Sequence, residues 1–126
     1  VVTASVVEGA PKLHQVWAGV HCNLAVNPLT IEAQVQGAAL MALGMTIPGA
    51  AITLKDGLVE QQNFGDYPVP RMPDMPVIEV HLVPSGDAPT GMGEPGVPPL
   101  APAFANALFA LTGKRLRKLP FDLAAA

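Results

Sequence analysis

The chain has 126 residues, of which half are hydrophobic and 13% are charged, and its net charge is −3. This length fits one domain, and the acidic balance argues against a nucleic-acid partner. Cys22 is the only cysteine, which excludes an intrachain disulfide and a zinc or iron–sulfur cluster built from this chain alone. So apolar a chain with so little charge is expected to bury surface against something larger than itself.

The first half of the chain predicts strands followed by one helix. VVTASVV (1–7) and residues 15–21 are rich in β-branched and aromatic residues, which is typical of strands. Asn27 followed by Pro28 predicts a helix start, with Asn as the N-cap and Pro at the first helical position. One stripe of this helix and its other faces are all apolar, which predicts a buried helix. The stripe consists of Ile31, Val35, Ala39 and Leu43.

The second half predicts a hairpin, a proline-rich connector (68–76), a strand and a second helix. Asp56-Gly57 favours the positive backbone angles of a two-residue turn. VIEVHLV (77–83) alternates, which predicts a half-exposed strand. A further helix over 99–113 ends at Gly113 as its cap, with Leu100, Phe104, Leu108 and Leu111 on its stripe. The order β-α-β-β-β-α predicts an α+β fold with two buried helices and short mixed or antiparallel strands.

The loop between this strand and the second helix, residues 84–99, is the first place to look for function, because long loops in compact domains tend to be functional. It holds Glu94 among glycines at 91, 93 and 96 and several prolines. A carboxylate held in a poorly solvated place has a raised pKa and serves well as a base. From spacing alone, however, the favoured role of Glu94 is to cap the following helix, where a negative charge is stabilised.

Other polar residues give weaker signals. Gln34 and Gln36 stand in a nearly apolar helix, where each amide either satisfies backbone groups or meets a polar ligand, and Gly37 permits close approach to that face. The three histidines share no spacing of metal ligands. The basic run KRLRK (114–118) is favoured as a solvated helix end over a specific anion site.

Longer stretches resemble a known family. GMGEPGVPPLAPAFANALFALTGKRLRKLPF (91–121) resembles the C-terminal segment of the large, molybdenum-binding subunit of the xanthine dehydrogenase/aldehyde oxidase family. VNPLTIEAQVQGAALMALG (26–44) and ITLKDGLVEQQNFGDYPVPRMPDMPVIEVHLV (52–83) match in order as well. The branch that they resemble most is the beta subunit of isoquinoline 1-oxidoreductase.

The resemblance implies a molybdenum hydroxylase that oxidises N-heterocycles with oxygen from water. Glu94 matches the active-site base, and Gln34 matches a glutamine that hydrogen-bonds the pterin. Gly91 and Gly93 match the loop beside the metal centre. The implied cofactor is molybdopterin, in its cytosine dinucleotide form, with iron–sulfur clusters on a partner subunit. No protein ligand to the metal is expected, because the pterin dithiolene holds molybdenum in this family.

The resemblance also implies partners. Residues 1–126 correspond to the C-terminal part of the molybdopterin-binding domain, so the remainder of the large subunit and a small iron–sulfur subunit are expected, and the isolated chain is expected to be inactive. A non-catalytic packing module and an aldehyde-oxidising enzyme are the alternatives. The compartment stays open between bacterial cytoplasm and periplasm. One departure is the segment 20–23, where relatives often carry Asp and Gly in a tight turn; Asn23 can take the left-handed conformation there.

Overall fold

The computed structural model describes residues 1–83 and 85–125. Its elements in chain order are β1 (Val2–Val7), β2 (Ala10–Val20), α1 (Pro28–Gly44), β3 (Leu54–Lys55), β4 (Leu58–Val59), β5 (Val77–Leu82) and α2 (Leu100–Thr112), with short 3₁₀ turns at Phe64–Asp66 and Met72–Asp74. The α+β class with two helices and short strands is confirmed.

A mixed three-stranded sheet forms the centre of the fold. Its order is β1-β2-β5, with β1 antiparallel and β5 parallel to β2. Two strands precede α1 where the predicted order counted one. They are joined at Glu8 and Gly9, which both have positive φ and form a tight turn that sequence reasoning missed.

β2 contains a β-bulge, and this bulge places one odd-numbered and one even-numbered residue of the strand in the core. The register with β1 shifts between Thr3, opposite Gln15, and Ala4, opposite Leu13, so His14 is the extra residue. Because of this extra residue, Leu13 and Val16 are both buried although alternation would place them on opposite faces. The His14 ring lies 2.6 Å from the Ser5 hydroxyl on the neighbouring strand.

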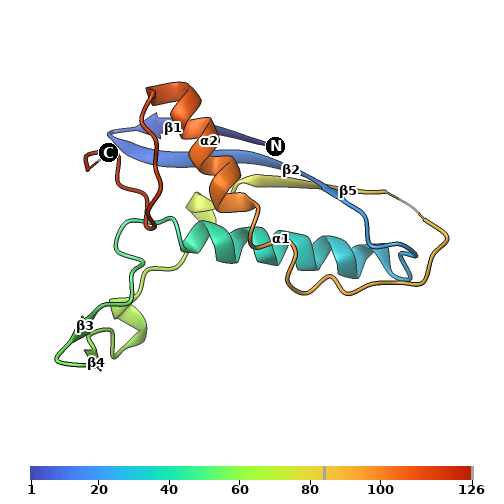
Figure 1. The fold of residues 1–126 in the computed structure, drawn as a ribbon, viewed down its shortest axis with the longest axis horizontal. Helices are drawn as coiled ribbons and strands as arrows, with labels where there is room; N and C mark the ends of the chain where they lie inside the picture. Colours follow the sequence, from blue (N-terminus) through green and yellow to red (C-terminus); the bar gives the residue numbers. More distant parts are fainter. Residues whose placement is uncertain (84, 126) are drawn as a thin grey trace.

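The core lies where the sheet, both helices and the C-terminal tail meet. In Figure 1, α2 crosses the strands at a steep angle and α1 runs alongside them. Phe104 and Leu108 of α2 are almost completely buried, and the Phe104 ring contacts Phe121 edge-on at 5.6 Å between centroids. The other core residues are Leu13, Val16, Ala39, Ala42, Leu43, Leu100 and Leu116.

The helix ends follow their sequence signals. The Asn27 side chain accepts a hydrogen bond from Thr30 N at 3.3 Å, with Pro28 at the first helical position of α1. Gly113 ends α2 in the left-handed conformation at φ 72. Both expectations are confirmed. The stripe of α2 is shorter than predicted, because Leu111 is 56% exposed.

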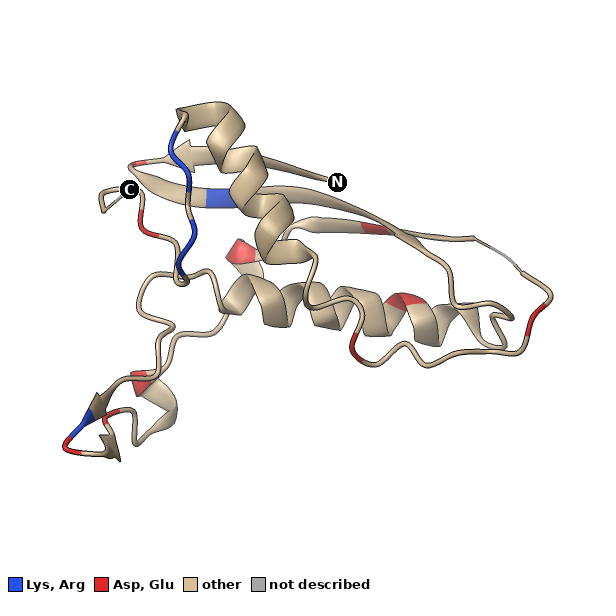
Figure 2. Ribbon diagram, viewed as in Figure 1, with Lys and Arg blue, Asp and Glu red and all other residues tan. Residues whose placement is uncertain are grey.

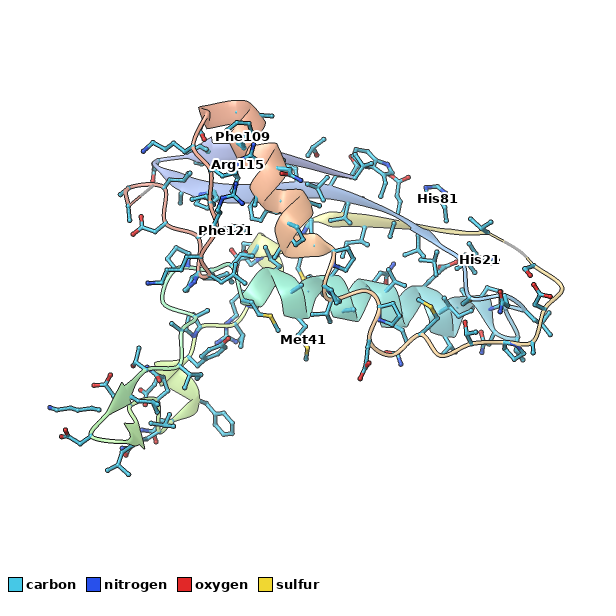
Figure 3. The ribbon with its side chains drawn as sticks, viewed as in Figure 1. His21, Met41, His81, Phe109, Arg115 and Phe121 are labelled. Carbon is cyan, nitrogen blue, oxygen red and sulfur yellow. The ribbon has the colours of Figure 1, made fainter. Side chains whose placement is uncertain are left out.

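The expected burial of α1 on all sides is wrong for this chain. Val35, Ala38, Ala39, Ala42 and Leu43 are buried along one stripe. The opposite face is open, and Met41 points away from the body of the molecule there (Figure 3). An apolar face without cover explains why the sequence pattern indicated burial.

Residues 51–67 form an arm that projects from this body, and the chain then returns so that the turn Met72–Asp74 lies beside the end of α1 (Figure 1). The arm carries the β3–β4 hairpin, whose Asp56-Gly57 turn has positive φ at both positions, as predicted. No residue of the arm is buried. Its large apolar side chains are exposed instead, including Ile52, Leu54, Leu58 and Phe64.

Candidate functional site

The loop over residues 85–99 is tied at its start to the turn that follows β2. Leu24 N donates to Asp87 O at 3.2 Å, and Thr90 N donates to the carbonyl of Cys22 at 3.2 Å. Asn23 has a left-handed φ of 63, and its Nδ2 donates to Ala88 O at 3.0 Å. The expectation that Asn23 takes this conformation is confirmed, and its side chain reaches the loop because of it.

The loop is fixed a second time just before α2 begins. Val97 N donates to the carbonyl of Glu94 at 3.1 Å, which closes a tight turn. Gly96 lies against α1 so closely that a Cβ on it would be 2.6 Å from Ala38 Cβ. Leu100 then enters the core as the first residue of α2. Glu94 therefore lies between two fixed points of the loop.

Glu94 is exposed at the surface of this chain. It lines a shallow hollow of about 520 Å³ together with Gly91, Gly93, Pro95 and Pro98. Its carboxylate accepts no hydrogen bond from the residues that the structure describes. It also does not cap α2, whose N-cap is Pro99 without a side-chain bond. The helix-capping alternative is therefore wrong, and the chain by itself does not desolvate the carboxylate.

A second, apolar cavity of about 430 Å³ lies behind the loop, and sequence reasoning did not find it. Trp17 and Val20 of β2 and Val35 and Ala39 of α1 contribute to its walls. Gly91 and Pro95 line both this cavity and the Glu94 hollow. The loop therefore separates the apolar cavity from the hollow that contains the Glu94 carboxylate. Only long-range packing creates this space, which is why no local motif signals it.

Gln34 and Gln36 are exposed on α1, as is Gly37, contrary to the expectation of buried amides. Within residues 1–83 and 85–125, neither glutamine side chain makes a hydrogen bond. Gln34 precedes Val35, whose side chain is buried against the apolar cavity. Its amide is therefore free to meet a polar ligand that covers this side of α1.

The loop also offers free backbone donors. Gly91 and Gly93 are exposed and have nothing within 4 Å of where a Cβ would stand. Among the described residues, the N–H groups of Gly91, Met92 and Gly93 have no hydrogen-bond partner. A planar, polar group such as a pterin carries several acceptors and donors along its edge. Free loop amides together with the Gln34 amide are chemically suited to such an edge.

The remaining ionisable residues do not gather into a site. His81 is exposed near Glu79, 3.8 Å from its carboxylate, as predicted for the polar side of β5. His21 directly follows β2, and His81 of β5 pairs with Gly19, two residues before it, so both histidines lie at the same end of these strands (Figure 3). No group of three or more His, Cys, Asp or Glu residues that could hold a metal ion is found in the described part of the chain.

The basic run 114–118 follows the end of α2 along the C-terminal tail (Figure 2). Arg115 lies over the Phe109 ring, 3.5 Å from its centroid, and donates to Asn106 Oδ1 at 3.2 Å. Lys114 Nζ donates to the carbonyl of Leu123 at 2.7 Å. Lys114 and Arg115 of the basic run therefore hold the C-terminal tail against α2, which is a structural role.

A family model described as the molybdopterin cofactor-binding domain matches residues 1–76. The chain belongs to this family. The predicted resemblance to a fragment of the molybdopterin-binding subunits of the xanthine dehydrogenase/aldehyde oxidase family is thereby confirmed. The matched part of the molybdopterin cofactor-binding domain includes β1, β2, α1 and Gln34, whereas Glu94 lies beyond it.

Individual relatives support the same family. The isoquinoline 1-oxidoreductase subunit beta of Brevundimonas diminuta is 32% identical over 119 residues, which are 94% of this chain and 15% of that protein. The membrane-bound aldehyde dehydrogenase [pyrroloquinoline-quinone] of Gluconacetobacter polyoxogenes is 35% identical over 101 residues, or 80% of this chain and 13% of that protein. The chain thus spans about a seventh of these relatives.

A solved structure shares the fold. The crystal structure of the Cu,Mo-CO dehydrogenase in its carbon monoxide reduced state superposes with a TM-score of 0.75 and 26% identity, over 90% of this chain and 15% of that one. Among the residues that the structure describes, no helix is both long and apolar enough to cross a membrane.

Proposed function

We propose that this chain is the C-terminal part of the molybdopterin-binding domain in a molybdenum hydroxylase, and that Glu94 is the active-site base. The observation that carries the proposal is the position of Glu94: an exposed carboxylate in a loop that is fixed on both sides, beside free backbone amides. Membership of the molybdopterin cofactor-binding family supplies the cofactor class.

Three residues would hold the cofactor. Gln34 offers its side-chain amide from α1, and Gly91 and Gly93 offer backbone N–H groups without side chains that would block close approach. When bound, the molybdenum cofactor, which we infer to be the cytosine dinucleotide form, supplies the redox chemistry that protein side chains lack. The chain itself binds and orients, and it contributes no metal ligand.

Glu94 would accept a proton at a carboxylate oxygen while water supplies oxygen to the substrate. The fixed loop keeps this oxygen in place, so little ordering is needed before the proton moves. Further polypeptide must close over the hollow, because a carboxylate exposed to water is a weaker proton acceptor than one shielded from it. We infer that the remainder of the large subunit provides this cover and that a small iron–sulfur subunit removes the electrons.

We propose N-heterocycles of the isoquinoline type as substrates. The matching isoquinoline relative aligns over 94% of the chain. An aldehyde substrate is the second candidate, favoured by the 35% identity to the aldehyde dehydrogenase. A non-catalytic packing module is the third candidate, and it predicts an assembly without molybdenum or pterin.

The test is Glu94→Gln in the complete enzyme, assayed with isoquinoline and with an aromatic aldehyde. The amide keeps the size of the side chain but accepts no proton, so we expect kcat to fall by about 10²- to 10⁴-fold with molybdenum and pterin content unchanged. The matched control is Glu60→Gln, an exposed glutamate on the arm, which should leave kcat unchanged.

Each other outcome is informative. Undiminished turnover by Glu94→Gln would contradict its role as base. Loss of the cofactor would make Glu94 a structural residue. Turnover of the aldehyde but not of isoquinoline would transfer the substrate assignment to the second candidate.

A further inference from the structure

Gly96 makes the tightest contact of any glycine in the described chain. A Cβ on Gly96 would lie 2.6 Å from Ala38 Cβ and 3.6 Å from the Cα and carbonyl oxygen of Val35. The φ of Gly96 is not positive, so the residue is required by lack of space and not by backbone conformation. Ala38 Cβ is attached directly to the α1 backbone, and no side-chain rotation can relieve the overlap.

This contact fixes the loop beside Glu94. The carbonyl of Glu94 accepts from Val97 N, so residues 94–97 form one tight turn with Gly96 inside it. Displacing Gly96 from α1 would therefore displace the whole turn. The other fixed point, Thr90 N bonded to Cys22 O, lies four residues before Glu94 and would not follow this movement.

The same contact relates Glu94 to Gln34. Ala38 stands one helical turn after Gln34, so the two side chains are neighbours on the surface of α1. We propose that Gly96 and Ala38 are positioning residues: their contact sets the distance between the loop that carries Glu94 and the helix face that carries Gln34. The proposal rests on the proposed function of these two residues.

The direct test is Gly96→Ala in the complete, cofactor-containing enzyme. The added methyl pushes the turn away from α1, and a displacement of about 1 Å at a reacting group can lower kcat by about 100-fold. We expect this loss with KM within about threefold of the wild type. We also expect faster amide hydrogen exchange over residues 91–97, which is measured without turnover.

The matched control is Gly86→Ala in the same loop. Gly86 is exposed, has nothing within 4 Å of where a Cβ would stand, and has no positive φ. It therefore receives the same methyl without a collision. Its kcat and its exchange over 91–97 should equal those of the wild type.

Rescue separates positioning from general destabilisation. Ala38→Gly alone weakens α1, since glycine is a poorer helix former than alanine. Combined with Gly96→Ala it removes the overlapping methyl, so the double variant should regain most of the lost kcat and slow exchange over 91–97. Independent destabilisation would make the double variant worse than either single one.

The outcomes distinguish this proposal from the proposed function. Wild-type kcat and exchange in Gly96→Ala, or failure of Ala38→Gly to restore either, would overturn the positioning role. If Gly96→Ala yields no folded enzyme, recovery of folded enzyme by the double variant supports the contact, and no recovery overturns it. Intact turnover in Glu94→Gln would overturn the proposed function alone, because the exchange measurement does not depend on catalysis.

Discussion

Asn23 connects two parts of the chain that are 65 residues apart in sequence. Its left-handed backbone turns the chain after β2, and its side chain donates to Ala88 O at the start of the loop. Asn is among the few residues other than Gly that take this conformation readily. One residue thus fixes both the turn and the first part of the loop that carries Glu94.

Asn23→Ala should destabilise the complete subunit by about 1–2 kcal/mol, because alanine both resists a positive φ and lacks the hydrogen bond. Asn23→Gly is the matched control: it keeps the backbone freedom and loses only the bond, so its cost should be smaller. Denaturant unfolding measures both. Equal stability of Asn23→Ala and the wild type would contradict the role of this residue.

For single residues, the sequence predicts which chemical groups the loop carries, but it does not predict which residues surround them. The glycines and prolines of the loop drew attention to Glu94, and its role as the active-site base stays a prediction. The exposure of Glu94 could not be predicted. The apolar residues near it indicate that this region is buried, but they do not indicate whether this chain or another polypeptide buries it. Gly96 was visible only as one loop glycine among several, since Ala38 lies 58 positions away.

Elements whose signals are local were predicted well. The start of α1 depends on Asn27 and Pro28, the β3–β4 hairpin on Asp56-Gly57, and the end of α2 on Gly113, all adjacent residues. The sheet order β1-β2-β5 depends on pairing between distant segments, which no local pattern encodes. The bulge at His14 likewise appears only when β1 sets the register.

The arm, residues 51–67, has no buried residue, and short-range polar contacts hold it. Asp66 accepts from the backbone N–H groups of Gln62 at 3.0 Å and Asn63 at 2.9 Å. These two bonds, first that of Gln62 and then that of Asn63, lower the pKa of Asp66 below its ordinary value. They favour the charged carboxylate and so order the turn that presents Phe64.

The order of this turn should therefore depend on pH. A lowered pKa means that Asp66 stabilises the turn fully above about pH 4 and ceases to do so as the pH falls through the lowered value. Titration of the Asp66 carboxyl by NMR, with amide exchange at 62 and 63, measures this. Asp66→Asn should abolish the pH dependence. A pKa at or above the ordinary value would show that the two bonds do not form.

Many large apolar side chains are exposed in the part of the chain that the structure describes. Phe64 is fully exposed, and Leu29, Met41 and Met72 are each at least 64% exposed. The chain spans about a seventh of its relatives, so most of the related proteins' length lies outside the part compared. We infer that this further polypeptide covers the open face of α1, the arm and the Glu94 hollow.

The central claim is that Glu94 faces the molybdenum cofactor once that cover is present. The most direct measurement is a structure of the complete, cofactor-loaded enzyme, in which the Glu94 carboxylate is located relative to the bound group. We predict a carboxylate oxygen within hydrogen-bonding reach of the cofactor's reactive end, at about 3 Å or through one water. A carboxylate that faces bulk solvent, with the cofactor bound elsewhere, would contradict the account.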